Sequence, residues 1–130
     1  MYKDNEVHFE GDFLFDKQAL STATDAQVSA AFRLGQTEGG IRVRAYFDEP
    51  AACSSGNAVT AVLKVADKAD AAATDWETIA SNTVTATGTA IEGEIFSFIP
   101  DTEADYMKLE ISNSAGMTGT ITAPIEYVPR

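Results

Sequence analysis

The sequence predicts an all-β protein, a single-domain antiparallel β-sandwich of jelly-roll type with about eight strands. Three observations lead to this fold class. The 130 residues include eight valines, eight isoleucines and seven phenylalanines, whose side chains fit the pleated surface of a sheet. Short runs of alternating apolar and polar residues are separated by turn signals about every ten residues. This spacing is typical of a sandwich or barrel and disfavours alternating strand and helix units.

The chain divides into a short arm and one domain. Residues 1–12 are polar and mostly acidic, with Val7 and Phe9 as apolar anchors, and are predicted to form an extended N-terminal arm. Residues 13–130 are predicted to form the β-sandwich, because this length allows one full core. Arms of this kind often contact a neighbouring molecule, which makes Phe9 a candidate interface residue.

The first two strands are predicted from short alternating runs. FLFDKQALS predicts a strand within residues 12–21. After a turn-prone segment, the alternation of Val28, Ala30 and Phe32 with Ser29, Ala31 and Arg33 predicts a second strand.

The run IRVRAYF, residues 41–47, has the clearest period of two in the chain. It places apolar side chains on one face of a strand and Arg42 and Arg44 on the other. This pair is the one local basic feature of an acidic chain, so both arginines are candidate interface residues. They could meet acidic groups of a partner or pair with carboxylates of their own chain across the sheet.

The middle of the chain contains the one segment in which a helix competes with a strand. Alternation over residues 59–66 predicts a strand, and the following segment contains five alanines, which favour a helix. Thr74 stands three residues before Glu77, as in a capping box. We therefore expect at most one short helix near residues 70–81.

Trp76 is the only tryptophan and the fourth candidate interface residue. A tryptophan offers a large contact area at low entropic cost, so it could anchor a sugar or a protein partner. Packing against the sandwich is the alternative explanation.

The remaining strands complete the sandwich. Strands are predicted over residues 83–87 and 94–98, and two alternating runs follow in YMKLEISNSAGMTGTITAPIEY. Because one turn-rich segment separates those runs, they predict a C-terminal β-hairpin formed by residues 106–127. Pro124 lacks an amide hydrogen, which predicts an edge position or a bulge.

Charge and cysteine content exclude several classes of partner. The formal net charge is −11 and the pI about 4.3, so the surface repels phosphate backbones and anionic lipids, and neither nucleic acid nor a membrane is an expected partner. Cys53 is the only cysteine, so no intrachain disulfide forms. The N-terminus has no signal-peptide pattern, and no apolar run is long enough to span a membrane, which favours folding in a cytosol.

Groups able to carry catalysis are scarce. His8 is the only histidine, Cys53 has no recognisable catalytic motif around it, and the carboxylates within 92–94 and 101–105 lack the aromatic surroundings of a glycosidase site. The glycines form neither a P-loop nor a dinucleotide fingerprint. The sequence therefore predicts a protein that is not an enzyme and that uses no cofactor or metal.

The order of these features resembles a known family over residues 13–125. The similarity is carried by four segments, LFDKQALSTAT, IRVRAYF, AVTAVLKVADKADAAATDWETIAS and YMKLEISNSAGMTGTITAPIEY. They resemble the small jelly-roll capsid cement (decoration) proteins of tailed bacteriophages. The resemblance implies a non-enzymatic virion protein, made in the host bacterial cytoplasm, that binds the outside of the major capsid protein lattice and stabilises the mature head.

Two further expectations concern the oligomeric state of the protein and its alternative functions. Closed symmetry and the two-fold positions of a capsid lattice favour a homodimer, with a trimer as the alternative. A carbohydrate-binding or tail-fibre-like β-sandwich module is the alternative function. An immunoglobulin-like domain of a secreted adhesin is a third, which the missing signal-peptide pattern disfavours.

Overall fold

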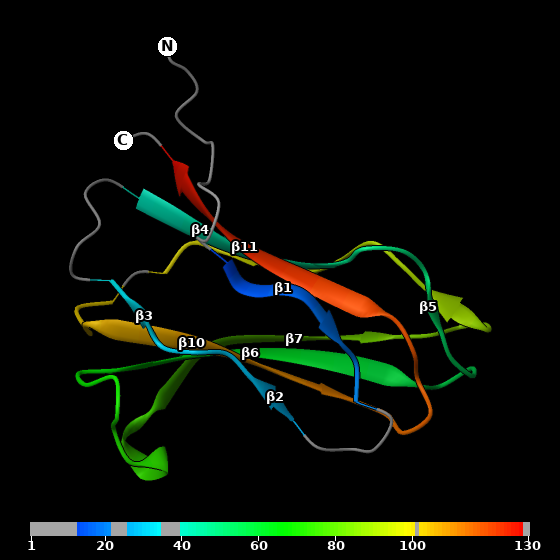
Figure 1. Ribbon diagram of the computed structural model, residues 1–130, viewed down its shortest axis with the longest axis horizontal. Helices are drawn as coiled ribbons and strands as arrows, with labels where there is room; N and C mark the ends of the chain where they lie inside the picture. The colour runs from blue at the N-terminus through cyan, green and yellow to red at the C-terminus, as the bar shows by residue number, and fades with distance from the viewer. Residues whose placement is uncertain (1–12, 22–25, 35–39, 101, 129–130) are drawn as a thin grey trace.

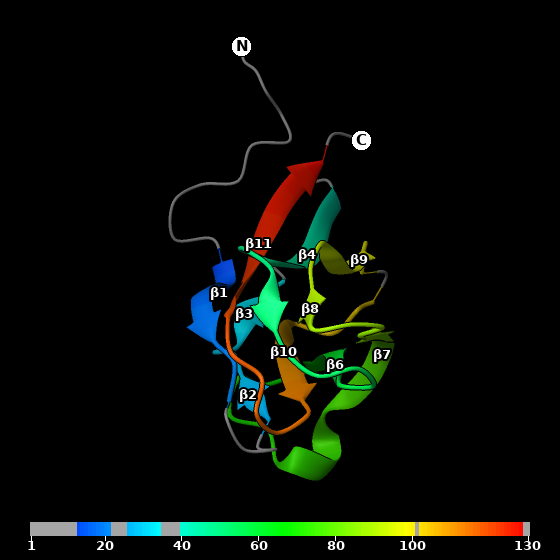
Figure 2. The same ribbon diagram turned by 90° about the vertical axis from the view of Figure 1, so that its right-hand side faces the viewer.

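The computed structural model describes residues 13–21, 26–34, 40–100 and 102–128, and these form two antiparallel β-sheets packed face to face (Figures 1 and 2). The eleven strands in these ranges are β1 (Phe13–Ala19), β2 (Gln27–Val28), β3 (Phe32–Arg33), β4 (Gly40–Phe47), β5 (Ala51–Ala52), β6 (Ala58–Ala66), β7 (Glu77–Thr85), β8 (Ala90–Ile91), β9 (Glu94–Phe98), β10 (Tyr106–Asn113) and β11 (Thr120–Val128). The prediction of an all-β antiparallel sandwich is confirmed.

The two main sheets have different strand orders. The four-stranded sheet, called sheet A, has the order β1-β11-β4-β9. The five-stranded sheet, called sheet B, has the order β2-β10-β6-β7, and β3 also pairs with β10. The short pair β5-β8 forms a third, two-stranded sheet. In Figure 2 the edge strands β1 and β2 lie on one side of the sandwich, and the edge strands β9 and β7 lie on the other.

The core fills the space between the sheets, and alternation along the strands explains its composition. Every second residue of β6 and β10 is buried, and these strands are in register, with Leu63 opposite Leu109 and both fully buried. Sheet A contributes Val43, Ala45 and Ile125, which are also fully buried. Burial of aliphatic side chains from both inner faces is the main stabilising contribution to a sandwich of this kind.

The predicted C-terminal hairpin is wrong. β10 belongs to sheet B and β11 to sheet A, so residues 114–119 cross from one sheet to the other. Within this crossover Met117 is fully buried, and Thr118 forms a β-bridge with Ala52. The alternating pattern shows which side chains face the core. It does not show which strand is the neighbour, because both sheets bury their inner faces against the same core.

Pro124 lies in an internal strand, between β1 and β4, and not at an edge. The irregularity predicted at this proline occurs on β1, whose pairing with β11 shifts between Phe13, opposite Pro124, and Phe15, opposite Ala123. A bulge of this kind lets a strand pair beside a residue that has no amide hydrogen to donate.

The second predicted strand is interrupted in the structure. Val28 is 52% exposed, whereas Ser29 is buried. The amide of Ser29 donates to the Leu109 carbonyl, and the amide of Leu109 donates to Ser29 Oγ, both at 2.9 Å. These bonds satisfy the buried serine and divide the predicted strand into β2 and β3.

The alanine-rich segment forms one 3₁₀ turn, Ala73–Asp75, as the expectation of at most one short helix near residues 70–81 allows. The capping box is wrong, because the N-cap is Ala72 and no side-chain hydrogen bond caps the turn. From Glu77 onward the chain pairs with β6, so β7 begins earlier than predicted. Cross-strand pairing outweighs the weak helix preference of the preceding alanines.

Two further local features differ from the alternation. In β9 a shift in the pairing with β4 buries the adjacent residues Ile95 and Phe96, and Ile99 beyond the strand is 51% exposed. The segment between β4 and β6 contains β5, in which Ala51 pairs with Ile91 of β8.

Candidate functional site

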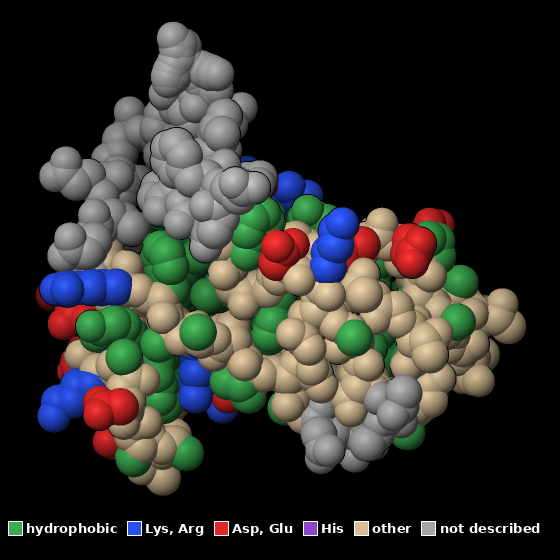
Figure 3. All heavy atoms as spheres, viewed as in Figure 1, with side chains coloured by type: hydrophobic (Ala, Val, Ile, Leu, Met, Phe, Trp, Pro, Cys, Tyr) green, Lys and Arg blue, Asp and Glu red, His purple; other side chains and the backbone are tan. Residues whose placement is uncertain are grey.

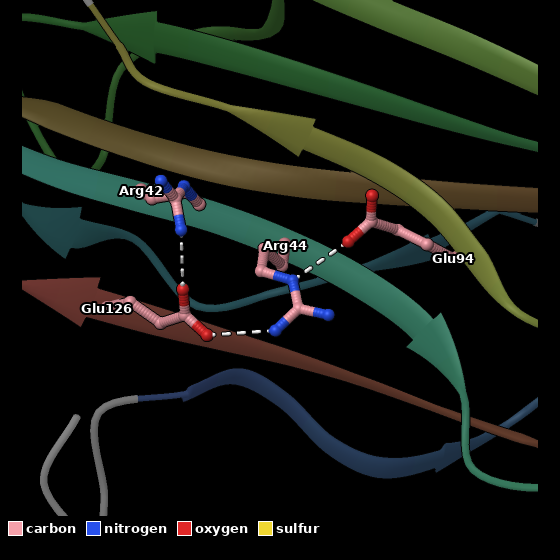
Figure 4. A network of polar contacts seen from close by, with 4 residues as sticks. All are labelled: Arg42, Arg44, Glu94 and Glu126. Atoms are coloured by element: carbon pink, nitrogen blue, oxygen red, sulfur yellow. Dashed lines mark hydrogen bonds and ion pairs between the residues drawn. The ribbon is translucent and has the colours of Figure 1, made fainter. Parts of the chain in front are cut away.

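A cluster of ion pairs covers part of the outer face of sheet A (Figure 4). Alternation along β4 turns Arg42 and Arg44 away from the core. Arg44 Nε donates to Glu94 Oε2 at 2.8 Å, and its Nη1 donates to Glu126 Oε2 at 3.0 Å. Arg42 Nη1 lies 3.4 Å from the other oxygen of Glu126. The guanidinium carbon of Arg44 also lies 5.4 Å from the centre of the Tyr46 ring.

These contacts keep Arg44 charged. Its hydrogen bonds to Glu94 and then to Glu126 raise the pKa of Arg44, which is already far above neutral in an unfolded chain. A pKa that is higher in the folded state stabilises the fold at all pH values below the unfolded pKa, and this contribution is lost only as the pH rises above it. The titration of Arg44 therefore adds no pH dependence to stability near neutral pH.

The structure realises the second of the two arrangements predicted for the arginine pair, because both guanidinium groups pair with carboxylates of their own chain. Glu126 pairs with both arginines and is therefore the central acceptor of the cluster. Its side chain is only 12% exposed. The four charges sum to zero, and this face of an acidic protein is locally neutral.

Trp76 lies on the opposite outer face of the sandwich, on sheet B. It is 9% exposed, and its Nε1 donates to the Ala71 carbonyl at 3.1 Å. Lys108 Nζ, on the outer face of β10, lies 4.4 Å from the centre of the indole ring. This is the packing alternative for Trp76, because a ring covered by an ammonium group and by its own loop offers little surface to a sugar.

The structure therefore does not bring the four candidate interface residues together. Arg42 and Arg44 lie side by side on sheet A, Trp76 lies on sheet B, and Phe9 falls outside the described residues. The predicted arm, residues 1–12, also lies outside them.

Glu94 and Cys53, two groups considered above as possible catalysts, each have a contact within their own chain. Glu94, one of the carboxylates considered above, is paired with Arg44, and Cys53 Sγ lies 3.9 Å from the Gly88 carbonyl oxygen. The described ranges hold no group of three or more His, Cys, Asp or Glu side chains placed to bind a metal ion. His8 lies outside these ranges.

Sequence reasoning missed a second polar network, which joins three segments of the chain. Both carboxylate oxygens of Asp48 accept hydrogen bonds, one from the Thr120 hydroxyl at 2.8 Å and one from the Thr122 hydroxyl at 2.7 Å. Thr122 Oγ1 in turn accepts the amide of Lys17 at 3.2 Å, where β1 adopts a positive φ of 54°. Thr120 and Thr122, two residues apart at the start of β11, were the only signal in the sequence.

Two shallow grooves lie on the described surface. One, of about 520 Å³, runs between the edge strands β7 and β9, and it is lined by apolar groups such as Ile79 and Phe98 and by polar ones such as Asn82. The other, of about 290 Å³, lies where Asp67, Asp75 and other acidic residues surround the start of β7. On the side of the molecule seen in Figure 3, basic and acidic side chains are interspersed.

No protein-family model and no curated protein matches this chain. In the part of the chain that the structure describes, no helix is long and apolar enough to cross a membrane.

Proposed function

We propose that this protein is a non-enzymatic capsid cement (decoration) protein, which binds the outside of a bacteriophage major capsid lattice and stabilises the mature head. One observation carries the proposal. The four segments that resemble cement proteins supply strands β1, β4, β6, β7, β10 and β11, which include the central strands of both sheets. The resemblance therefore involves the framework of the fold.

The strand order supports the jelly-roll subtype. If β2 and β3 are counted as one interrupted strand and the short pair β5-β8 is left out, eight strands remain. Renumbered along the chain, they have the order 1-8-3-6 in sheet A and 2-7-4-5 in sheet B. This order supports an eight-stranded jelly roll, in which two Greek keys are wrapped into a double sheet.

The charge distribution supports a contact that combines long-range attraction with apolar packing. The chain carries −11 in total, whereas the arginine pair on sheet A is neutralised by its own carboxylates. The proposed partner surface on the major capsid protein is basic or neutral. Exposed ion pairs are weak and are screened over about 8 Å at physiological ionic strength, so buried apolar contacts supply the lasting part of the affinity.

Many copies of a small protein can hold a lattice together without a tight individual contact. If a homodimer, or alternatively a trimer, touches two capsomers at once, the second contact is intramolecular and raises the avidity by roughly 10² to 10⁴. We propose the virion exterior as the site of action and the host bacterial cytoplasm as the site of synthesis.

A binding experiment on capsid particles tests the proposal. Purified protein is added to particles of the matching phage that lack it, and the association and dissociation rates are measured at low and high salt. We expect saturable binding and raised particle stability, with salt slowing association more than it speeds release, because long-range charge sets the on-rate. Absence of binding would refute the proposed function.

The same assay separates the alternative function. A carbohydrate-binding or tail-fibre-like module predicts saturable binding on a glycan array and none on the particles. The burial of Trp76 disfavours this alternative, since the only tryptophan is not presented as a flat, open ring.

A further inference from the structure

The sandwich has four sheet edges, which differ in how well they resist pairing with another chain. β1 and the β2/β3 segment form the edges on one side, and β9 and β7 form those on the other (Figure 2). An exposed edge presents unpaired amide and carbonyl groups, and proteins usually protect it with charges, bulges or short strands.

Three of the four edges carry such protection. β1 has a register shift, a positive φ at Lys17 and the charged, exposed pair Asp16 and Lys17. β2 and β3 are only two residues long each. β9 has five residues and a bulge, and the carbonyl of Ile95 accepts a hydrogen bond from Asn82 Nδ2 at 2.7 Å.

β7 has less protection than these edges, because its one bulge lies near its start, at Ile79, where the pairing with β6 shifts. It has nine residues, and among the described residues it pairs with β6 alone. Residues 78–85 read TIASNTVT, with no charge, no proline and no glycine, and each is exposed or half-buried. The groove between β7 and β9, which has both apolar and polar lining, follows the same edge. A long, uncharged edge rich in β-branched residues is a template for an added strand.

We propose that β7 forms a homodimer interface by antiparallel pairing with β7 of a second copy. The charge pattern favours a second copy as the occupant. Two chains that each carry −11 repel one another, but an antiparallel pairing within residues 78–85 places no like charges opposite each other. About an axis through Asn82, regular pairing covers residues 80–84, beyond the bulge at Ile79, and adds about four backbone hydrogen bonds.

The two faces of β7 are also compatible with a two-fold axis. From the pairing with β6, Ala80, Asn82 and Val84 lie on the core side, while Ser81 and Thr83 lie on the outer side. An axis through Asn82 sets Ala80 opposite Val84 of the second copy and Ser81 opposite Thr83. Each opposed pair then lies on the same face, as an antiparallel sheet requires. Sheet B of the two copies becomes one continuous sheet.

Sedimentation velocity of the free protein over a range of micromolar concentrations tests the proposal. Ser81→Lys places two lysines close to the axis, and we expect it to weaken dimerisation by about tenfold or more. Val28→Lys is the matched control, because Val28 is exposed on the edge on the other side of sheet B, and it leaves the dimer unchanged. Equal melting temperatures of the two variants and the wild type would show that the fold is intact.

A second measurement does not depend on how a variant folds. In wild-type protein, hydrogen exchange of the β7 amides slows as the concentration rises, whereas exchange of the β2 amides does not change. A wild-type protein that stays monomeric, or a dimer that Ser81→Lys leaves intact, would overturn the inference. Protection of β7 only on capsid particles would overturn it as well and would assign the edge to a capsid-protein strand. Since these experiments use free protein, their result does not depend on whether the proposed capsid binding holds.

Discussion

Met117 provides a direct test of the crossover between the two sheets. It lies in a segment of small and polar residues that, in a β-hairpin, would project into solvent. In the structure its side chain is fully buried within the core cluster, between the end of β10 and the start of β11. The change Met117→Ala therefore removes buried apolar atoms and leaves a cavity.

The expected cost of this change is large for a single substitution. Fully buried methionine-to-alanine changes cost about 2–5 kcal/mol, through lost transfer free energy and the cavity that remains. For a domain of this size each kcal/mol lowers the melting temperature by roughly 3–6 °C, so we expect a fall of roughly 10 °C or more.

Urea denaturation, with the slope of the transition compared between variants, provides the measurement. Met107→Ala, at a fully buried position near the start of β10, is the positive reference and costs a similar amount. Thr118→Ala is the neighbouring control, since its side chain is exposed and its cost stays below about 0.5 kcal/mol. If Met117→Ala costs as little as Thr118→Ala while Met107→Ala is severe, the crossover is not packed as described and the reasoning fails.

Three further predictions concern local contacts. Gly119→Ala destabilises the protein by about 1 kcal/mol more than Gly116→Ala in the same urea assay. Both glycines have positive φ, but only at Gly119 does an added Cβ meet Ala51, at 3.0 Å. Equal costs of the two changes would contradict this. Arg44→Glu places a third carboxylate beside Glu94 and Glu126 and lowers the free energy of unfolding by about 1–3 kcal/mol. Arg42→Glu costs less, because Arg42 has one carboxylate partner, and the reverse order would mean that the cluster does not form in solution. Trp76 fluorescence is blue-shifted and poorly quenched by acrylamide, and Lys108→Ala increases the quenching because it uncovers the ring; free access of acrylamide in the wild type would refute the buried position.

The sequence alone predicted the fold class and which side chains of most long strands are buried. In β4, β6 and β10 each second side chain is apolar, and a strand directs alternate side chains to opposite faces. The exposure of Arg42 and Arg44 followed from the same rule. These properties depend on residues close together in the chain, which is why the pattern predicted them.

Only the tertiary structure decided which segments become neighbours. The carboxylate partners of Arg44 lie 50 and 82 residues further along the chain, and no local pattern relates them to the arginine. For the same reason β10 and β11 read as a hairpin although they belong to opposite sheets. Strand pairing depends on contacts distant in sequence, and alternation specifies a buried face without specifying the adjacent strand. The edge position of β7 could not be predicted from the sequence either, because it depends on the strand order of the folded sheet.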